Sequence, residues 1–374
     1  MTPALDGQWP RWLQPYTYFR DTHGVISYYL GAGMAPLADG RVRAIAVYLP
    51  LDTAGLAVGQ RLQPASIDPR DGMVYTKTAY QGRTYEHAQA SGVASPDILA
   101  WLEENTVADL GGMSLGILPE DIVEIFDGRE ALQRLLHTSG DDPTSLFAVQ
   151  ADILTALHSA VDALERAGIS PESLRLYGSL ACGIRRVIGG VTDIDLVVDD
   201  RSAKAGITSI CAGNSVVETK IQGWLRQDAK RFANAVRRGE TSQFHVETHS
   251  GDLTQIDIRI SAGSPLSDVY PRLRTYPFFG SRIASRGRII DDTGGLSFPP
   301  TFIVACFDGV IRRVCSDYYQ WIGAAATGDE VTFRGTKLGS DTVLLGDTPV
   351  DYLVVEERAK PLTPSGGSSD LRAG

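Results

Sequence analysis

Leu174-Arg-Leu-Tyr-Gly-Ser179 and Asp193-Ile-Asp-Leu196 are the two segments that decide the fold, and 13 residues separate them. Each segment contains a short apolar run bounded by turn residues or charges, which is typical of a buried strand. Alternate side chains of a strand share a face, so Asp193 and Asp195 point the same way, about 7 Å apart along the chain. The apolar residues between and after them then point into the core.

The aspartate pair predicts a cation site. Two carboxylates on one strand face repel each other unless a cation lies between them. Mg²⁺ prefers oxygen ligands and is usually held by one or two carboxylates together with substrate phosphates. Asp-x-Asp at a strand end is by itself more often a solvated loop entry, so the prediction depends on the neighbouring segments.

The Gly178-Ser179 turn suits a phosphate group. Glycine lets the backbone approach a phosphate closely, and the Ser179 hydroxyl can donate a hydrogen bond. If a helix begins at this turn, its free N–H groups and its dipole favour an anion. Arg185 and Arg186 follow shortly afterwards and are further candidates for nucleotide binding, or for pairing with the carboxylates of the next strand.

A third carboxylate, Asp257, lies 62 residues after Asp195, between two isoleucines. The runs 244–248 and 253–260 predict a hairpin around the turn Ser250-Gly251-Asp252. An adjacent strand, parallel or antiparallel, would bring Asp257 to the aspartate pair. There it would bind a second metal ion and take a proton from an acceptor hydroxyl.

These three elements, in this order, resemble the signature of the DNA polymerase β-like nucleotidyltransferase superfamily. The matching region spans 174–260, under a quarter of the chain. Segments 21–24, 42–48 and 328–335 are similar to a predicted nucleotidyltransferase family best represented in archaea. The resemblance implies an α+β fold, with a polymerase β-like nucleotidyltransferase core of mixed sheet and helices flanked by β-rich N- and C-terminal segments.

The resemblance also implies a role for each motif residue. Asp193 and Asp195 would ligate two Mg²⁺ ions, with Mn²⁺ as an alternative. Asp257 would complete the catalytic metal site and act as, or assist, the general base. Gly178 and Ser179 would hold the β- and γ-phosphates of an NTP. The implied reaction is in-line attack of an acceptor on the α-phosphate, with pyrophosphate as the leaving group.

A basic stripe is another candidate for phosphate binding. Residues 221–238 have helical periodicity, which places apolar side chains on one side and Arg226, Lys230 and Arg237 on the other. We expect Lys230 to contact the triphosphate. The alternative is a solvated helix face, which is the commoner role of such a charge run.

Patterning along the chain predicts four segments. Residues 1–115 form a β-rich N-terminal segment and 116–265 the nucleotidyltransferase core. A β-rich C-terminal segment, 266–360, precedes a disordered tail, 361–374, that is rich in Pro, Ser and Gly.

Periodicity and turn residues predict the regular elements of these segments. The expected strands outside the core are 24–30, 42–49, 73–80, 281–291, 302–304, 329–335 and 350–355. The expected helices are 96–105, 119–137, 145–167 and 308–321.

Composition and charge narrow the function. The chain has 374 residues, with 35 Lys and Arg against 45 Asp and Glu, and the resulting net charge of −10 argues against a general nucleic-acid coat protein. The sequence has no apolar run of about 18 residues, so we expect no transmembrane helix. The first residues do not resemble a secretory signal. The four cysteines lack CxxC spacing, which favours reduced thiols and a cytoplasmic location.

The expected function is therefore transfer of NMP from an NTP to a hydroxyl or phosphate group of a small molecule, with no membrane partner. The acidic balance favours a small acceptor over a long nucleic acid. Two alternatives stay open: nucleotide addition to RNA or to a protein, and a catalytically inactive nucleotide-binding regulatory module.

Overall fold

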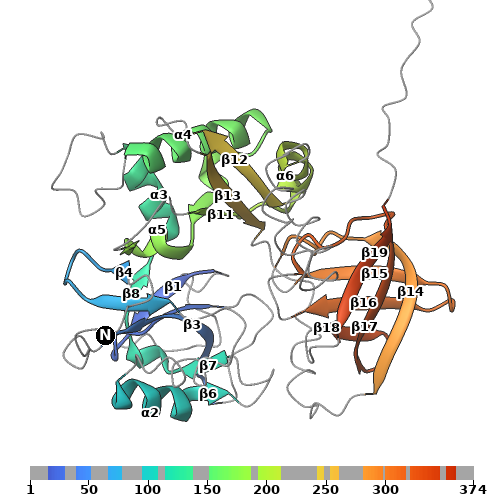
Figure 1. Cartoon of the computed structure of the whole chain (residues 1–374), viewed down its shortest axis with the longest axis horizontal. Helices are drawn as coiled ribbons and strands as arrows, with labels where there is room; N and C mark the ends of the chain where they lie inside the picture. The colour runs from blue at the N-terminus through green and yellow to red at the C-terminus, as the bar shows by residue number, and fades with distance from the viewer. Residues whose placement is uncertain are drawn as a thin grey trace, which may run out of the picture.

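The chain forms three sheets with helices around the middle one (Figure 1). They are seen in a computed structural model, which describes residues 16–29, 39–51, 66–77, 95–107, 114–137, 151–186, 193–211, 242–247, 253–260, 281–297, 300–316, 321–345 and 351–358. Within these ranges, no helix combines the length and the apolarity that crossing a bilayer requires.

The N-terminal sheet has nine strands, and all of its strand pairings are antiparallel. The strands are β1 (Tyr18–Asp21), β2 (Ile26–Tyr29), β3 (Val42–Pro50), β4 (Ser66–Ile67), β5 (Val74–Lys77), β6 (Thr106–Val107), β7 (Ser114–Ile117), β8 (Ile122–Phe126) and β10 (Arg185–Arg186). Their β-branched and aromatic residues suit a pleated surface.

Helix α2 (Pro96–Asn105) confirms the helix predicted at 96–105. Ser95 caps its N-terminus by accepting a hydrogen bond from the Ile98 N–H, and Pro96 occupies the first turn, where its missing N–H costs nothing. Trp101 and Leu102 are buried in one apolar cluster with residues of β2, β3 and β7.

The central sheet has four strands in the order β12-β13-β11-β9. Its strands are β9 (Leu174–Leu176), β11 (Ile194–Val198), β12 (Gln243–Glu247) and β13 (Leu253–Ile260). Strands β11 and β13 are parallel, while β9 and β12 pair antiparallel at the two edges. The predicted hairpin of β12 and β13 is confirmed.

One face of the central sheet is apolar and joins the largest core. Leu176, Leu196 and Ile258 are register neighbours with at most 1% exposure. Leu157 and Leu164 of α4 (Ala151–Arg166) belong to the same buried cluster, and α4 contacts both β12 and β13. Helices α3 (Gly128–His137) and α6 (Lys204–Cys211) contact α4 (Figure 1). The opposite face of the sheet is left for polar residues.

The C-terminal sheet closes into a five-stranded barrel, because β14 pairs with both β15 and β17. Its strands are β14 (Arg282–Asp291), β15 (Thr301–Cys306), β16 (Ile311–Ser316), β17 (Glu330–Leu338) and β18 (Thr342–Leu345), with β19 (Tyr352–Glu357) added along β17. Gly287 and Gly335 lie where a side chain would collide with the backbone of the neighbouring strand. Close strand approach therefore requires glycine at both positions.

The predicted fold class is wrong. Among the described residues, strands account for 46% and helices for 28%. The described residues include a closed five-stranded barrel and, outside it, five α-helices. The molecule is therefore mainly β and not an α+β fold with a polymerase β-like core. The α+β prediction was based on one short region, 174–260, whereas the C-terminal sheet and every strand of the N-terminal sheet except β10 lie outside that region.

Two predicted helices are also wrong in part. At 119–137, a 3₁₀ turn (Pro119–Asp121) leads into strand β8, and α3 begins only at Gly128. At 308–321, residues Ile311–Ser316 form strand β16. Both segments contain β-branched residues, and both are paired in sheets, β8 with β1 and β16 with β15 and β18. Strand pairing therefore overrides the local helical spacing. The predicted segments 221–238 and 361–374 lie outside the described residues.

Candidate metal centre

Strands β11 and β13 bring three carboxylates together. Asp195 and Asp257 are register partners on these parallel strands, and Asp193 directly precedes β11. One carboxylate oxygen of each residue lies within 4.8 Å of those of the other two. Asp257 is buried, whereas Asp193 and Asp195 are half-buried, so solvent reaches part of the group. We call these three residues the aspartate triad.

The aspartate triad fits a hard divalent cation. Oxygen atoms bound to one octahedral Mg²⁺ ion lie about 3 to 4 Å from one another. The oxygens of the triad lie within 4.8 Å of one another, and its donors are all carboxylate oxygens, the ligands that Mg²⁺ and Mn²⁺ prefer. Asp195 and Asp257 are far apart in the sequence, but they are register partners on two neighbouring strands and are therefore close in space.

Two glutamines orient Asp257. Gln243 is its register partner on β12, and the Gln243 side-chain amide donates a hydrogen bond to Oδ1. Gln255, which lies on β13 with Asp257, donates a hydrogen bond from its Nε2 to Oδ2 of Asp257 at 3.2 Å. A neutral amide directs a carboxylate oxygen without cancelling its charge, which is the usual role of residues behind a metal ligand. Neither glutamine was identified from the sequence, although the two-residue step from Gln255 to Asp257 was a usable signal.

Arg259 places a buried positive charge beside the aspartate triad. It follows Asp257 by two residues on β13, so both side chains leave the same face of the strand, and its residue exposure is 4%. Burial alone lowers the pKa of Arg259, but Tyr177, Asp257 and Asp195 raise it, and the net shift is upward. The guanidinium stays charged and offsets part of the negative charge of the triad.

The Gly178-Ser179 turn lies directly against the aspartate triad. It opens the short helix α5 (Gly178–Cys182) immediately after β9. Gly178 has a φ of +73°, and a side chain at this position would collide with the carboxylate of Asp195. Glycine is therefore required both by the backbone conformation and by the close approach. The turn and the triad, predicted separately, are neighbours.

The remaining predicted nucleotide-binding residues are Arg185, Arg186 and Lys230. Arg185 and Arg186 form β10, whose backbone pairs with Ile67 and Ser66 of β4 in the N-terminal sheet. Lys230 lies outside the described residues. The part of the site that the structure brings together is thus the aspartate triad with the Gly178-Ser179 turn.

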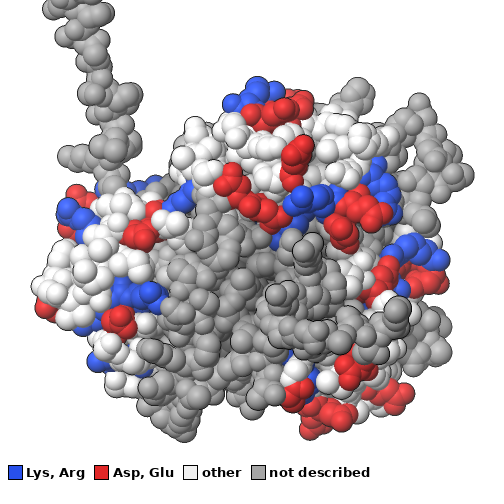
Figure 2. Space-filling model, turned by 180° about the vertical axis from the view of Figure 1, so that it is seen from behind, with Lys and Arg blue, Asp and Glu red and all other residues white. Residues whose placement is uncertain are grey.

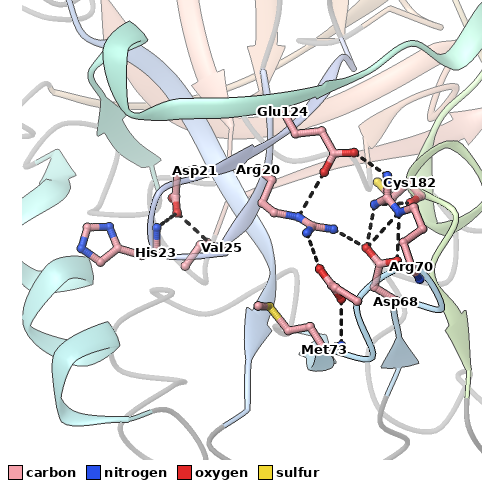
Figure 3. A network of polar contacts seen from close by, with 10 residues as sticks. Arg20, Asp21, His23, Val25, Asp68, Arg70, Met73, Glu124 and Cys182 are labelled. Atoms are coloured by element: carbon pink, nitrogen blue, oxygen red, sulfur yellow. Dashed lines mark hydrogen bonds and ion pairs between the residues drawn. The ribbon is translucent and has the colours of Figure 1, made fainter.

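A second group of carboxylates lies in the N-terminal sheet, and arginines hold all of its members (Figure 3). Asp71 and Glu124 are paired with Arg20 at 2.7 and 3.3 Å, and Asp68 is paired with Arg70 at 2.6 Å. Arg20 also pairs with Asp68, and Arg70 with Glu124. We call these five residues the arginine-bound cluster.

Comparisons with protein-family models, with curated proteins and with solved structures gave no match for this chain. The site is therefore interpreted from its own geometry and chemistry.

Proposed function

We propose that this chain is a metal-dependent nucleotidyltransferase, which moves NMP from an NTP to a hydroxyl or phosphate group of a small molecule and releases pyrophosphate. The observation that carries the proposal is the aspartate triad, whose oxygens lie within 4.8 Å of one another, with the Gly178 backbone packed against Asp195. The resemblance of these motif residues to DNA polymerase β-like nucleotidyltransferases supports the same chemistry. The proposal concerns the site and not the overall fold.

Each residue of the site has a defined task in this proposal. Asp193, Asp195 and Asp257 would hold two Mg²⁺ ions, or Mn²⁺, which when bound neutralise the triphosphate and activate the attacking and leaving oxygens. Asp257, oriented by its two amide donors, accepts the proton of the acceptor hydroxyl or assists its removal. Gly178 admits the phosphates close to the backbone, and the Ser179 hydroxyl donates to them.

The charge distribution supports a small acceptor. The chain carries a net charge of −10, and Figure 2 shows acidic and basic side chains interleaved over the described part of one face. A protein that tracks a polynucleotide would instead present a stripe of one sign. Nucleotide addition to RNA is the alternative, and steep weakening of binding with added salt would favour it. The four described cysteines are buried and free, which agrees with the proposed cytoplasmic location.

Pyrophosphate release tests the proposal. Wild type and Asp193→Ala are assayed with each of the four NTPs and Mg²⁺, over a panel of small acceptors and RNA. Asp200→Asn is the matched control, because Asp200 is an exposed aspartate just after the same strand. We expect release that requires an acceptor, is lost in Asp193→Ala and is retained in Asp200→Asn.

Binding measured without turnover separates the alternatives. Mn²⁺ and Mg²⁺-NTP affinities are determined for the same three proteins by calorimetry. Saturable nucleotide binding without pyrophosphate release in the presence of any acceptor would contradict the transferase and favour the regulatory module. Release that is unchanged in Asp193→Ala would remove the aspartate triad from the mechanism.

A further inference from the structure

The Gly178-Ser179 turn is the point where the chain crosses from one sheet to another. Strand β9 leads into the turn from the central sheet. After α5, residues Arg185–Arg186 form β10, which pairs with β4 of the N-terminal sheet. In Figure 1, α5 accordingly lies between the two sheets. The N-terminal sheet is therefore structurally continuous with the proposed phosphate-binding turn.

Two side chains of the N-terminal sheet hold this turn from outside. Arg70 Nη2 donates to the Cys182 carbonyl at 3.5 Å, at the last residue of α5 (Figure 3). The hydroxyl of Tyr48 shares a hydrogen bond with the side chain of Ser179. The first contact fixes the end of α5, and the second acts on the hydroxyl that the proposed function assigns to the phosphates.

Tyr48 is held rigidly for this task. It lies in β3, where Ile26 of β2 and Lys77 of β5 are its partners on either side, and it is 2% exposed. Burial raises the pKa of Tyr48 far above its ordinary value, and Cys182, Asp195 and Asp193 raise it further. The phenol thus keeps its proton at every physiological pH and takes part only as a hydrogen-bonding group.

We propose that Tyr48 is a positioning residue for Ser179, so that the N-terminal sheet forms part of the nucleotide site. A free serine hydroxyl rotates among three staggered positions, whereas a bond to an immobile phenol selects one of them. A donor that is already oriented binds its ligand without the entropy cost of ordering. This inference rests on the proposed function, because it assigns a phosphate contact to Ser179.

Tyr48→Phe tests the inference, and Tyr75→Phe is the matched control. Tyr75 is also fully buried, its ring packs edge-on against that of Tyr48 at 6.4 Å, and its hydroxyl has no hydrogen-bond partner among the described residues. Both variants lose one buried oxygen from the same layer, but only Tyr48→Phe loses the contact with Ser179. KM and kcat are measured with the NTP that wild type uses best, and Kd for Mg²⁺-NTP is measured by calorimetry.

We expect Tyr48→Phe to raise KM and Kd for the nucleotide about 3- to 10-fold, the factor that one hydrogen bond contributes, with a smaller change in kcat. Tyr75→Phe should stay within about 2-fold of wild type. In a Ser179→Ala background, Tyr48→Phe should have no further effect, since its partner is already absent. Circular dichroism and thermal unfolding confirm that each variant is folded.

The outcomes distinguish this inference from the proposed function. If wild type transfers or binds nucleotide and Tyr48→Phe behaves like Tyr75→Phe, the role of Tyr48 is overturned and the transferase stands. Additive effects of Tyr48→Phe and Ser179→Ala would also overturn it, because Tyr48 would then act through another group. If wild type neither binds nor transfers any NTP, both proposals fail.

Discussion

The arginine-bound cluster and the aspartate triad each contain three carboxylates, but the groups that hydrogen-bond to these carboxylates differ. Every carboxylate of the arginine-bound cluster lies against a guanidinium, and the Asp68 side chain is completely buried. In the aspartate triad, Asp257 is oriented by neutral amides, and the buried cation Arg259 lies beside the group on the same strand.

This difference indicates different roles. Ion pairs with arginine compensate a buried carboxylate and join the strands that carry the partners, so the arginine-bound cluster is a structural element. Amide donors orient a carboxylate and leave its charge available to a cation. Removing a carboxylate should therefore reduce stability in the cluster and reduce function in the triad.

Asp195→Asn is expected to have the largest effect of the four changes below. Loss of a direct ligand should exceed the 10- to 100-fold loss typical of residues behind a ligand, so we expect kcat/KM to fall by more than about 100-fold. In metal-free buffer the melting temperature should stay unchanged or rise, because one like-charge repulsion is removed. A large decrease in metal-free stability would show that the triad is structural, like the cluster.

Asp68→Asn should produce the opposite pattern. It leaves Arg20 and Arg70 without their shared buried partner, which is expected to lower the free energy of unfolding by about 3 kcal/mol. Urea unfolding measures the change. Glu130→Gln is the control, because the Arg134–Glu130 pair is exposed and should contribute less than about 0.5 kcal/mol. Equal effects in both variants would contradict a structural role for the cluster.

Gln243→Leu should weaken metal binding with little effect on stability. It removes a hydrogen bond that orients Asp257, and loss of such a contact typically reduces metal affinity by about 10- to 100-fold. Mn²⁺ titration measures the change, and Gln133→Leu, at an exposed glutamine of α3, is the control. Unchanged Mn²⁺ affinity in Gln243→Leu would mean that the amide does not prepare Asp257 for a cation.

Asp21 provides a third case, a buried carboxylate beside the arginine-bound cluster (Figure 3). Its Oδ1 accepts hydrogen bonds from the His23 and Val25 N–H groups, whereas its Oδ2 has no partner among the residues described. Burial raises the pKa of Asp21 to about 7. The folded state therefore holds a proton that the unfolded chain releases near pH 4, and stability falls as pH rises between these values.

Asp21→Asn removes this titration. Relative to wild type, the variant should gain at most about 2.7 kcal/mol of unfolding free energy between pH 5 and pH 8, because the slope of about 1.36 kcal/mol per pH unit acts over about two units. Urea unfolding at the two pH values measures the difference. Parallel pH profiles of variant and wild type would show that Asp21 is not the titrating group.

Patterns that depend on neighbours in sequence were predictable. The strands β9, β11 and β13 follow from short apolar runs ended by turn residues or charges, and helix α2 follows from its apolar periodicity after Pro96. The aspartate triad was predictable because strand alternation places Asp193 and Asp195 on one face, and because Asp257 occupies a comparable position in another strand. The helix predicted at 145–167 is confirmed over the described residues of α4.

Features that depend on strand pairing were not predictable. Segment 122–126 has both a helical spacing and a β-branched composition, and only its pairing with β1 selects the strand. Register made Gln243 the partner of Asp257, and the crossing of β10 into the N-terminal sheet brought Tyr48 to Ser179. Local sequence specifies turns, alternation and candidate ligands because these arise within a few residues. Other features depend on contacts between residues far apart in the chain: closure of the barrel, the mainly β architecture and the contact of the N-terminal sheet with the Gly178-Ser179 turn. Local sequence patterns do not predict the free energy of such contacts.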